Sequence, residues 1–169
     1  DDNLETIMIR LLRGSGIDGL TGIQRYNSIH NLRVVRPLLS VSREELRGYL
    51  NKKKVRWIDD PSNLDEQFQR VKVRRLLPIM ADFGLSANKL LTLAEHMSRA
   101  KLALNLEVIK FARANVFQMI WGDIEIDREE FMNLPEEYQF RLLSAMLRWI
   151  SGKVYRPRFK SLKTLSETL

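Results

Sequence analysis

The chain opens with Asp1-Asp2-Asn3-Leu4-Glu5-Thr6-Ile7-Met8-Ile9-Arg10-Leu11-Leu12-Arg13-Gly14-Ser15-Gly16, which joins an acidic start to an apolar stripe and a glycine-rich end. Gly14 is placed as the residue after a helix that must adopt a left-handed backbone. The apolar residues recur at helical spacing and predict one buried helix face, made of Leu4, Ile7, Met8, Leu11 and Leu12.

Charged residues mark both ends of this predicted helix. Asp2 and Glu5 are three residues apart, so their carboxylates share one face of the first turn, where they could hold an ammonium group or a metal ion. The simpler interpretation is that Asp1, Asp2 and Glu5 complement the helix dipole, as Arg10 and Arg13 would at the other end. Spacing alone favours this simpler interpretation, because acidic helix starts are common.

The composition is that of an ordinary globular protein with a basic surface. The 169 residues suffice for one domain or two small ones, and 28 basic against 21 acidic residues give a net charge of +7 that favours a polyanionic partner. The chain has no cysteine, which excludes disulfides and thiolate catalysis, and His30 and His96 lack a zinc-like spacing. We find no signal peptide and no apolar run near the roughly 20 residues of a membrane span, so we expect a cytoplasmic protein without membrane contact.

The first half alternates strand and helix signals. Residues 32–39 carry the strongest strand pattern, which Pro37 should confine to an edge or end, whereas residues 25–31 have the composition of a loop. Ser42 and Glu45 form a capping box at the start of a helix. A further helix from Glu66 should end or kink at Pro78. The buried face of the capped helix is predicted to comprise Leu46, Tyr49 and Leu50.

The second half is predominantly helical. Ser86 is placed to cap a long amphipathic helix that runs to about Ala114, followed by a β-hairpin at residues 116–127 that folds at Gly122-Asp123. Asp127 caps a short helix, Pro135 begins another that stops at Gly152, and residues 159–169 are again helical. We expect the stripe of the long helix, from Leu90 to Phe111, to pack against the helix that begins at Pro135. The three tryptophans are expected in the core rather than as stacking platforms, namely Trp57, Trp121 and Trp149.

The opening stretch closely resembles the second signature of the tRNA(Ile)-lysidine synthetases, which reads His-x-x-Asp-Asp-Gln-x-Glu-Thr and then Arg-Gly-Ser-Gly, with Asn3 in place of the usual Gln. Further landmarks follow in the family's order, and the order is the specific signal, since each alone is a generic turn or helix start. The resemblance is strong over residues 1 to about 80 and diffuse beyond. The landmarks are Arg36-Pro37-Leu38-Leu39, Ser42-Arg43-Glu44-Glu45-Leu46, Asp60-Pro61-Ser62-Asn63 with Asp65, Phe68-x-Arg70-x-x-Val73-Arg74, and Tyr155-x-Pro157-Arg158-Phe159.

The resemblance implies a fold and a domain division. Residues 1–84 would be an α/β remnant, the C-terminal part of a PP-loop, Rossmann-like catalytic domain of the adenine nucleotide alpha hydrolase-like type. Residues 85–169 would be a mostly α-helical domain with a small β-hairpin that binds tRNA, and the change of periodicity around Gly84 marks the boundary. The family's ATP-binding loop, Ser-Gly-Gly-x-Asp-Ser, does not occur in the chain, so we expect a fragment that is inactive alone.

Members of this family are N-type ATP pyrophosphatases. They adenylate C2 of the wobble cytidine of a tRNA(Ile) with a CAU anticodon, and the ε-amine of lysine then displaces AMP to give lysidine. The resemblance therefore implies a ligase that uses ATP and Mg²⁺ as cofactors and acts on tRNA(Ile) and lysine. A homodimer is retained among the expected partners.

The resemblance also assigns roles to individual residues. Asp2, Glu5 and Arg70 are the candidate catalytic residues, with the two acids holding the lysine substrate and Arg70 suited to its carboxylate or to a phosphate. Asp1 is assigned to the nucleotide or Mg²⁺ side. For Lys72 and Arg75 we prefer a solvated basic helix face. The candidate RNA-binding residues are Arg10, Arg13, Gly14, Ser15, Gly16, Arg36 and Arg74.

Two other functions are compatible with the same scaffold. One is a non-catalytic RNA-binding or interaction module, against which the paired acids Asp2 and Glu5 beside a basic helix argue, because a pure binder has no use for them. The other is a different PP-loop enzyme that modifies tRNA. The relatives that thiolate tRNA typically bring cysteines, which this chain lacks.

The net charge leads to a first testable prediction. We expect the chain to bind tRNA weakly and with an affinity that falls as salt rises, because each phosphate contact releases a counterion. Fluorescence anisotropy with a labelled tRNA transcript at a series of salt concentrations measures this dependence. An affinity that stays constant from low to physiological salt would contradict it.

Overall fold

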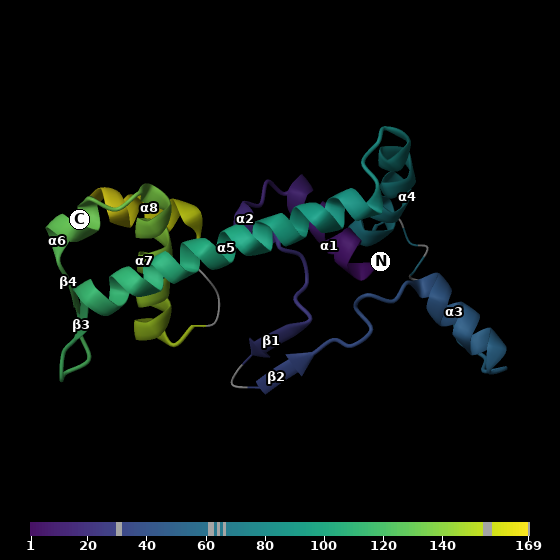
Figure 1. Cartoon of the computed structure of the whole chain (residues 1–169), viewed down its shortest axis with the longest axis horizontal. Helices are drawn as coiled ribbons and strands as arrows, with labels where there is room; N and C mark the ends of the chain where they lie inside the picture. Colours follow the sequence, from purple (N-terminus) through teal and green to yellow (C-terminus); the bar gives the residue numbers. More distant parts are fainter. Residues whose placement is uncertain (30–31, 61–62, 64, 66, 154–156, 169) are drawn as a thin grey trace. The chain divides into compact units, whose positions relative to one another are not determined.

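The computed structural model of the protein describes residues 1–29, 32–60, 63, 65, 67–153 and 157–168 (Figure 1). These residues form two compact units, Asp1–Ala100 and Lys101–Leu169, which divide within helix α5 (Ala87–Asn115). The predicted domain boundary after residue 84 stays a prediction. Several residues named in the sequence analysis lie outside the described residues: His30, Pro61, Ser62, Glu66 and Tyr155.

Helix α1 (Asp2–Leu12) confirms the helix predicted for the opening stretch. Gly14 has a φ of +68°, and the amides of Gly14 and Ser15 donate to the carbonyls of Leu11 and Arg10, both at 2.9 Å. This pair of bonds is the Schellman arrangement that ends a helix at a left-handed residue. The predicted buried face is only partly buried, with Ile7 and Met8 enclosed but Leu11 and Leu12 39% and 64% exposed.

The chain after Gly14 folds back onto α1 through the short helix α2 (Ile17–Leu20). The side-chain oxygen of Asn3 accepts a hydrogen bond from the amide of Ile23 at 2.7 Å. Gly22 has a φ of +66°, and a Cβ at this position would lie 2.3 Å from the same Asn3 oxygen. The close approach therefore requires a glycine at position 22.

Two short strands follow, β1 (Tyr26–Ile29) and β2 (Leu32–Val35), which pair antiparallel with Tyr26 opposite Val35. The strand predicted over residues 32–39 is present in its first half and ends before Pro37. The prediction of a loop over residues 25–31 is wrong, because residues 26–29 form β1. Their mostly polar side chains carry no strand pattern, and pairing with β2 supplies the order instead.

Helix α3 (Arg43–Lys52) begins with the predicted capping box. The amide of Glu45 donates to the Ser42 hydroxyl at 3.1 Å, and the amide of Ser42 donates to the Glu45 carboxylate at 2.7 Å. These bonds to Ser42 hold the pKa of Glu45 below its ordinary value. The predicted buried face of this helix is wrong, since none of its residues is buried and Tyr49 is 59% exposed.

Helix α4 (Gln69–Asp82) and the first part of α5 complete the first unit. Pro78 lies inside α4 and does not end it, because residues on either side of it, Leu77 and Met80, pack against the buried core and hold the helix together. The core of this unit consists of Met8, Val73 and Leu90, with Ile7 and Val71 also buried.

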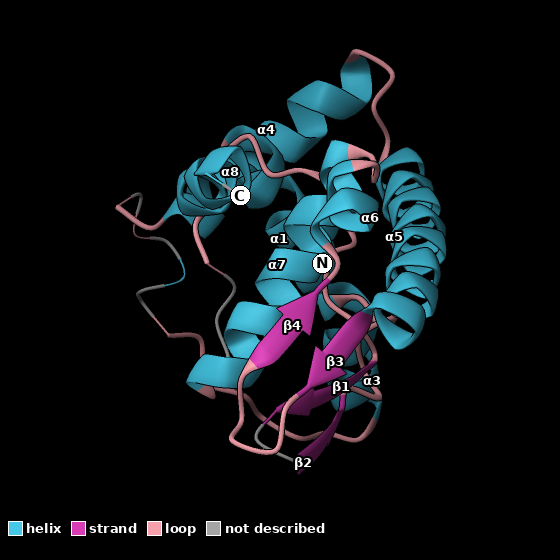
Figure 2. Ribbon diagram, turned by 90° about the vertical axis from the view of Figure 1, so that its left-hand side faces the viewer, coloured by secondary structure: helices cyan, strands magenta, loops and turns pink. Residues whose placement is uncertain are grey.

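The second unit joins the end of α5 to the hairpin of β3 (Val116–Gln118) and β4 (Ile124–Ile126), shown in magenta in Figure 2. Both this hairpin, with its turn at Gly122, and the cap of Asp127 on α6 (Arg128–Met132) confirm the sequence prediction. Helix α7 (Glu136–Ser151) stops at the left-handed Gly152, as predicted, and α8 (Phe159–Thr168) packs against it.

The core of the second unit lies between α5, α6, α7 and α8. The rings of Phe140 and Phe159 meet edge to face at 4.9 Å, and the buried Ser166 hydroxyl donates to the side-chain oxygen of Gln139 at 2.7 Å. No helix in the described part of the chain is long and apolar enough to cross a membrane. The buried apolar residues are Val108, Phe131, Phe140, Leu142, Leu143 and Leu162.

Two expectations about the core are wrong. Leu90 packs with Met8 and Val73 in the first unit rather than with the helix that begins at Pro135. The tryptophans are not core residues, since Trp57, Trp121 and Trp149 are 38%, 73% and 69% exposed. Apolar neighbours in sequence do not bury a side chain when the helix or turn presents them to solvent.

The contact between Gly22 and Asn3 provides a stability prediction. We expect Gly22→Ala to lower the free energy of unfolding by about 2 to 3 kcal/mol, because it adds backbone strain and breaks the Asn3–Ile23 hydrogen bond. Urea denaturation followed by circular dichroism measures the change. Gly14→Ala is the matched control, since it has the same left-handed φ but no atom within 4 Å of the added Cβ, and should cost only about 1 kcal/mol. Equal losses in the two variants would contradict the steric argument.

Candidate active site

A partly buried ion pair joins α1 to α4 in the first unit. Glu5 is 1% exposed, and its two carboxylate oxygens accept hydrogen bonds from Nε and Nη2 of Arg74 at 2.5 and 3.3 Å. The bond to Glu5 raises the pKa of Arg74 above its ordinary value, with smaller contributions from the charges of Glu5 and Asp2. A carboxylate removed from water in this way requires a cation, which Arg74 provides.

Asp1 and Asp2 lie at the same end of α1 as this ion pair. The carboxylate of Asp1 accepts a hydrogen bond from the backbone amide of Arg43 at 2.7 Å. This amide belongs to the first turn of α3, where the helix dipole favours a negative charge. Asp2 is exposed, and its charge reaches Arg74. Three acids from one short stretch are therefore gathered around the start of two helices.

A cavity of about 420 Å³ adjoins the ion pair. Two acids, Asp1 and Glu5, and two arginines, Arg43 and Arg74, contribute to its lining. The remaining lining is apolar, so the cavity combines charged groups of both signs with a hydrophobic wall. This combination suits a small ligand that carries its own charges on an aliphatic chain. The apolar lining residues are Leu4, Leu77, Pro78, Ala81 and Ala87.

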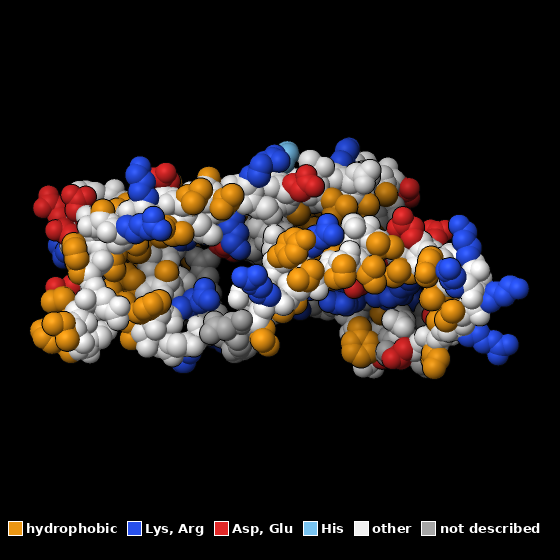
Figure 3. All heavy atoms as spheres, turned by 60° about the horizontal axis from the view of Figure 1, so that its bottom comes forward, with side chains coloured by type: hydrophobic (Ala, Val, Ile, Leu, Met, Phe, Trp, Pro, Cys, Tyr) orange, Lys and Arg blue, Asp and Glu red, His pale blue; other side chains and the backbone are white. Residues whose placement is uncertain are grey.

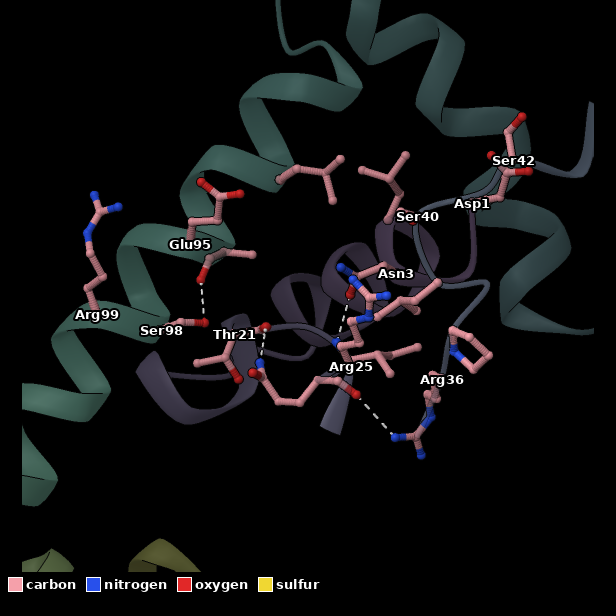
Figure 4. Close-up of a pocket in the computed structure, with 17 residues that line it drawn as sticks. Asp1, Asn3, Thr21, Arg25, Arg36, Ser40, Ser42, Glu95, Ser98 and Arg99 are labelled. Atoms are coloured by element: carbon pink, nitrogen blue, oxygen red, sulfur yellow. Dashed lines mark hydrogen bonds between the residues drawn. The ribbon is translucent and has the colours of Figure 1, made fainter. Parts of the chain in front are cut away.

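A larger cavity of about 690 Å³ lies between the start of α1, residues 21–42 and α5. Figure 4 shows Glu95 and Ser98 on α5 across this cavity from Asn3 and Arg25. Arg36 donates to the carbonyl of Gln24 at 3.2 Å at its edge. Asp1 borders this cavity as well as the smaller one, so the acidic start of α1 faces both.

Arg70 lies on α4, one turn before Arg74, and lines a different cavity of about 430 Å³. Arg13 lines the same cavity and donates to the side-chain oxygen of Gln69 at 2.5 Å. Asp2 borders another cavity, which Arg36 and Arg43 also line. Among the described residues, the predicted site residues Asp2, Glu5 and Arg70 thus do not line one common cavity. Arg74 connects two of them, because it lines the cavity of Glu5 and also the cavity of Arg70.

Several of the predicted RNA-binding residues have acceptors within the chain. Arg10 donates to the carbonyls of Gly19 and Gly22 at 2.9 and 3.1 Å and so ties α1 both to α2 and to the loop after it. Arg74 binds Glu5, as described above. By contrast, Gly14 and Gly16 are exposed, and a Cβ at either would meet no atom within 4 Å. The assignment of these residues to RNA stays a prediction.

Comparison with known proteins identifies a matching domain model and a group of related proteins. A model of the PP-loop domain matches residues 1–80. We call these residues the PP-loop segment. The predicted resemblance to tRNA(Ile)-lysidine synthetases is confirmed by relatives that match most of the chain.

Three relatives named tRNA(Ile)-lysidine synthase illustrate this similarity. The protein from Ruegeria pomeroyi is 35% identical over 158 residues, which are 94% of this chain and 38% of the relative. The protein from Wolbachia pipientis wMel is 37% identical over 165 residues, 96% of this chain and 38% of the relative. The protein from Rhodopseudomonas palustris is 35% identical over the whole chain and 49% of its own length. The chain thus spans less than half the length of these relatives.

Sequence reasoning missed part of the arrangement within the PP-loop segment. It assigned Arg74 to RNA and did not pair it with Glu5, 69 residues away, because no local pattern links positions so far apart. One signal was present, since Glu5 lies three residues before Met8 on the apolar stripe and a buried acid needs a cation. The backbone amide of Arg43 as a partner of Asp1 left no signal in the sequence.

The described residues of the PP-loop segment and of the second unit contain no group of three or more His, Cys, Asp or Glu that could hold a metal ion. Mg²⁺ is commonly bound by only one or two carboxylates together with water and substrate phosphates. The acids Asp1 and Asp2 are compatible with that limited role. A dedicated metal cage would need more oxygen ligands than they provide.

The ion pair of the PP-loop segment gives a second stability prediction. We expect Arg74→Met to lower the free energy of unfolding by about 3 kcal/mol, because it leaves the buried Glu5 carboxylate without its cation. Chemical denaturation at neutral pH measures the change. Lys72→Met, an exposed position on the same helix, is the control and should change stability by less than about 0.5 kcal/mol. The double variant Glu5→Gln/Arg74→Met should recover part of the loss, and a double variant no more stable than Arg74→Met would contradict the role of the buried charge.

Proposed function

We propose that this chain forms part of a tRNA(Ile)-lysidine synthase, an ATP-dependent ligase that joins lysine to C2 of the wobble cytidine of tRNA(Ile). The observation that supports this most strongly is the similarity to tRNA(Ile)-lysidine synthases across 94% or more of the chain. It includes both the acidic stretch and the helical second unit. The chain spans 38% to 49% of the length of these relatives. The proposed activity is therefore that of a longer protein, of which this chain would form one part.

The lysine substrate carries two ammonium groups, one carboxylate and an aliphatic chain between them. We assign Asp2 and Glu5 to an ammonium group, because closely spaced carboxylates in a partly desolvated site bind it by charge-assisted hydrogen bonds. The Glu5–Arg74 pair supports this assignment in a specific way. Arg74 fixes the Glu5 carboxylate before lysine arrives. Asp2 is exposed and Arg70 lines a neighbouring cavity that Arg74 also borders, so these two side chains would turn toward Glu5 to bind the ammonium group and the carboxylate of lysine.

The cavity of about 420 Å³ beside Glu5 and Arg74 is the proposed place for the aliphatic part of lysine. Its apolar wall of Leu4, Leu77 and Pro78 would exclude water from the four methylenes. Exclusion of water also strengthens the contact between the ammonium group and the acids. The nucleophile is the neutral ε-amine, so an acid nearby has a second use as the acceptor of its proton.

ATP and Mg²⁺ are proposed on the side of Asp1. When bound, Mg²⁺ would neutralise charge on the phosphates of ATP. The hydrogen bond from the Arg43 amide holds the Asp1 carboxylate at the edge of two cavities. We further propose that residues 1–84 are the C-terminal part of a Rossmann-like catalytic domain, and that the protein works in the cytoplasm.

The tRNA would meet the exposed turn of Arg13, Gly14, Ser15 and Gly16 and the helical second unit. A turn without side chains lets an RNA backbone approach closely, while Arg13 offers a phosphate contact. Arg36 and Arg10 are assigned to RNA with less support, because both bind backbone carbonyls of the chain. A homodimer of the enzyme is kept among the proposed assemblies.

A non-catalytic RNA-binding module is the second candidate, and one observation favours it. The pairing of Glu5 with Arg74 gives the buried acid a purely structural use, which weakens the argument that a binder has no need of it. Another PP-loop enzyme that modifies tRNA would share the same pairing. Lysine transfer to tRNA separates the three functions.

The decisive experiment uses a chimaera in which this chain replaces the matching segment of the Ruegeria pomeroyi tRNA(Ile)-lysidine synthase. We expect it to transfer radioactive lysine to a tRNA(Ile) transcript in the presence of ATP. Glu5→Gln in the chimaera should raise the KM for lysine about tenfold or more, because one charged hydrogen bond is lost, while pyrophosphate release from tRNA adenylation continues. Glu44→Gln, an exposed acid on α3, is the control and should leave both unchanged.

An unchanged KM for lysine in the Glu5→Gln chimaera would show that the assignment of Glu5 is wrong. A folded chimaera that binds tRNA but transfers no lysine would contradict the proposed function itself and favour the binding module.

A further inference from the structure

The end of helix α3 and the residues that follow it form an exposed surface in which four cations lie between two aromatic residues in the sequence. We define the α3 basic surface by Tyr49, Lys52, Lys53, Lys54, Arg56 and Trp57. We propose that the α3 basic surface binds an unpaired strand of RNA, with phosphates on the lysines and a base against an aromatic ring. The inference deepens the proposed function, on which the identity of the RNA as tRNA rests, and it adds a site that neither the family motifs nor the cavities indicated.

The charge and exposure of this surface are the first argument. Every residue from 51 to 60 is exposed. Four positive charges lie within five residues, at Lys52, Lys53, Lys54 and Arg56. Among the described residues, no acidic side chain forms an ion pair with any of these four. Figure 3 shows lysine and arginine side chains projecting at the right-hand edge of the view, over α3.

The helix dipole does not account for these cations. A lysine in the last turn of a helix stabilises it, and Lys52 can serve in this way. The effect is confined to the last turn, however, and Lys54 and Arg56 lie beyond the end of α3 at Lys52. The helix end therefore does not explain their positive charges.

The backbone of Lys54 is the second argument. Its φ is +55°, and it is the only described residue other than glycine with a positive φ. The amides of Lys54 and Val55 donate to the carbonyls of Asn51 and Leu50, both at 3.0 Å. This is the same helix end that α1 builds with Gly14 and α4 with Gly84.

A lysine in the position where the chain elsewhere uses glycine carries backbone strain that glycine would relieve. Strain of this kind persists where the side chain is needed. The side chain of the exposed Lys54 makes no contact that stabilises the fold among those described, although its backbone amide helps to end α3. Its side chain is therefore best explained by a ligand, and its charge by an anionic one.

The aromatic rings are the third argument. The guanidinium of Arg47 lies 5.7 Å from the centre of the Trp57 ring. Asp59 holds both groups, since it pairs with Arg47 at 2.5 Å and accepts a hydrogen bond from the Trp57 ring nitrogen at 3.3 Å. Trp57 is thus oriented in advance while 38% of it remains exposed. Tyr49, 59% exposed, lies under Lys53 at 5.9 Å.

Cations interleaved with oriented aromatic rings match a single strand of RNA better than an acidic protein. Every base has a π-face that can stack on an aromatic ring, and phosphates recur along the strand at short intervals. An acidic protein surface would engage the lysines but would leave the rings without a partner. We therefore commit to an unpaired RNA strand such as a loop.

The first test measures RNA binding by the whole chain with fluorescence anisotropy, using a labelled anticodon stem–loop and a labelled oligouridine. The variant Lys52→Gln/Lys53→Gln/Lys54→Gln should weaken binding about tenfold or more at low salt and reduce the salt slope by about 2. The charge-matched control is Arg33→Gln/Lys72→Gln/Lys89→Gln, three exposed cations of the first unit that lie outside α3 and are not assigned to RNA. Equal losses in the two triple variants would overturn the proposal, because binding would then depend on net charge alone.

The second test separates binding from stability. Lys54→Gly removes one positive charge and relieves the backbone, so the variant should have an unchanged or higher Tm and still bind RNA more weakly, with a salt slope smaller by about 0.7 to 0.9. A merely structural role of Lys54 would produce the higher Tm without the loss of affinity. That outcome would overturn the use of Lys54 as a phosphate contact.

The third test measures whether a base stacks on the ring of Trp57. The chain has three tryptophans, so Trp121→Phe/Trp149→Phe leaves Trp57 as the only one. Its fluorescence should be quenched by oligouridine and not by poly-L-glutamate. Equal quenching or equal affinity with poly-L-glutamate would indicate a surface for acidic chains in general and would overturn the proposal.

These experiments distinguish a failure of the α3 basic surface from a failure of the proposed function. Lysine transfer by the chimaera together with unaltered RNA binding by the Lys52/Lys53/Lys54 variant would reject the α3 basic surface and leave the ligase function standing. RNA binding that depends on the α3 basic surface, in a chimaera that transfers no lysine, would reject the ligase and retain the RNA site.

Discussion

A buried carboxylate that must have a cation governs the arrangement of the first unit. Glu5 is enclosed on α1 and is neutralised by Arg74 of α4, and the same two helices contribute Met8 and Val73 to the core. Ion pairs of this kind do not add much net stability, but they are costly to break and so allow few alternative packings. The register of α1 against α4 is therefore fixed by charge as well as by shape. That register determines where Asp1, Asp2 and Arg70 can lie.

Local signals in the sequence predicted most of the elements correctly. The capping box at Ser42, the glycine turn after α1 and the stop at Gly152 depend on neighbouring residues, and all three are present. The polar strand β1 was missed because its order comes from pairing with β2, and Pro78 was overrated because tertiary packing holds α4 together. Of the candidate site, the acids were found from their spacing. Their partners were not, since Arg74 and the amide of Arg43 reach them only through the fold.

Helix α5 shows why an amphipathic stripe does not identify its own partner. Its apolar positions follow one pattern from Leu90 to Phe111, yet Leu90 belongs to the core of the first unit and Phe111 packs against the core of the second. The 3.6-residue period indicates which side of a helix is buried and contains no information on what covers it. The exposed tryptophans make the related point for single residues. Trp57 has apolar neighbours in sequence, but Arg47 and Asp59 hold it at the surface.

The contact between Asn3 and Gly22 links the family signature to a loop that no motif describes. The synthetases usually have Gln at the position of Asn3, and a side chain longer by one methylene cannot occupy the same space while its oxygen still meets the amide of Ile23 at 2.7 Å. A change of the side chain at position 3 therefore changes the space that is available at position 22. Gly22 also has a φ of +66°, so its backbone favours glycine whichever residue stands at position 3. The effect of a replacement at either position therefore depends on the side chain at the other one and on the backbone of the loop.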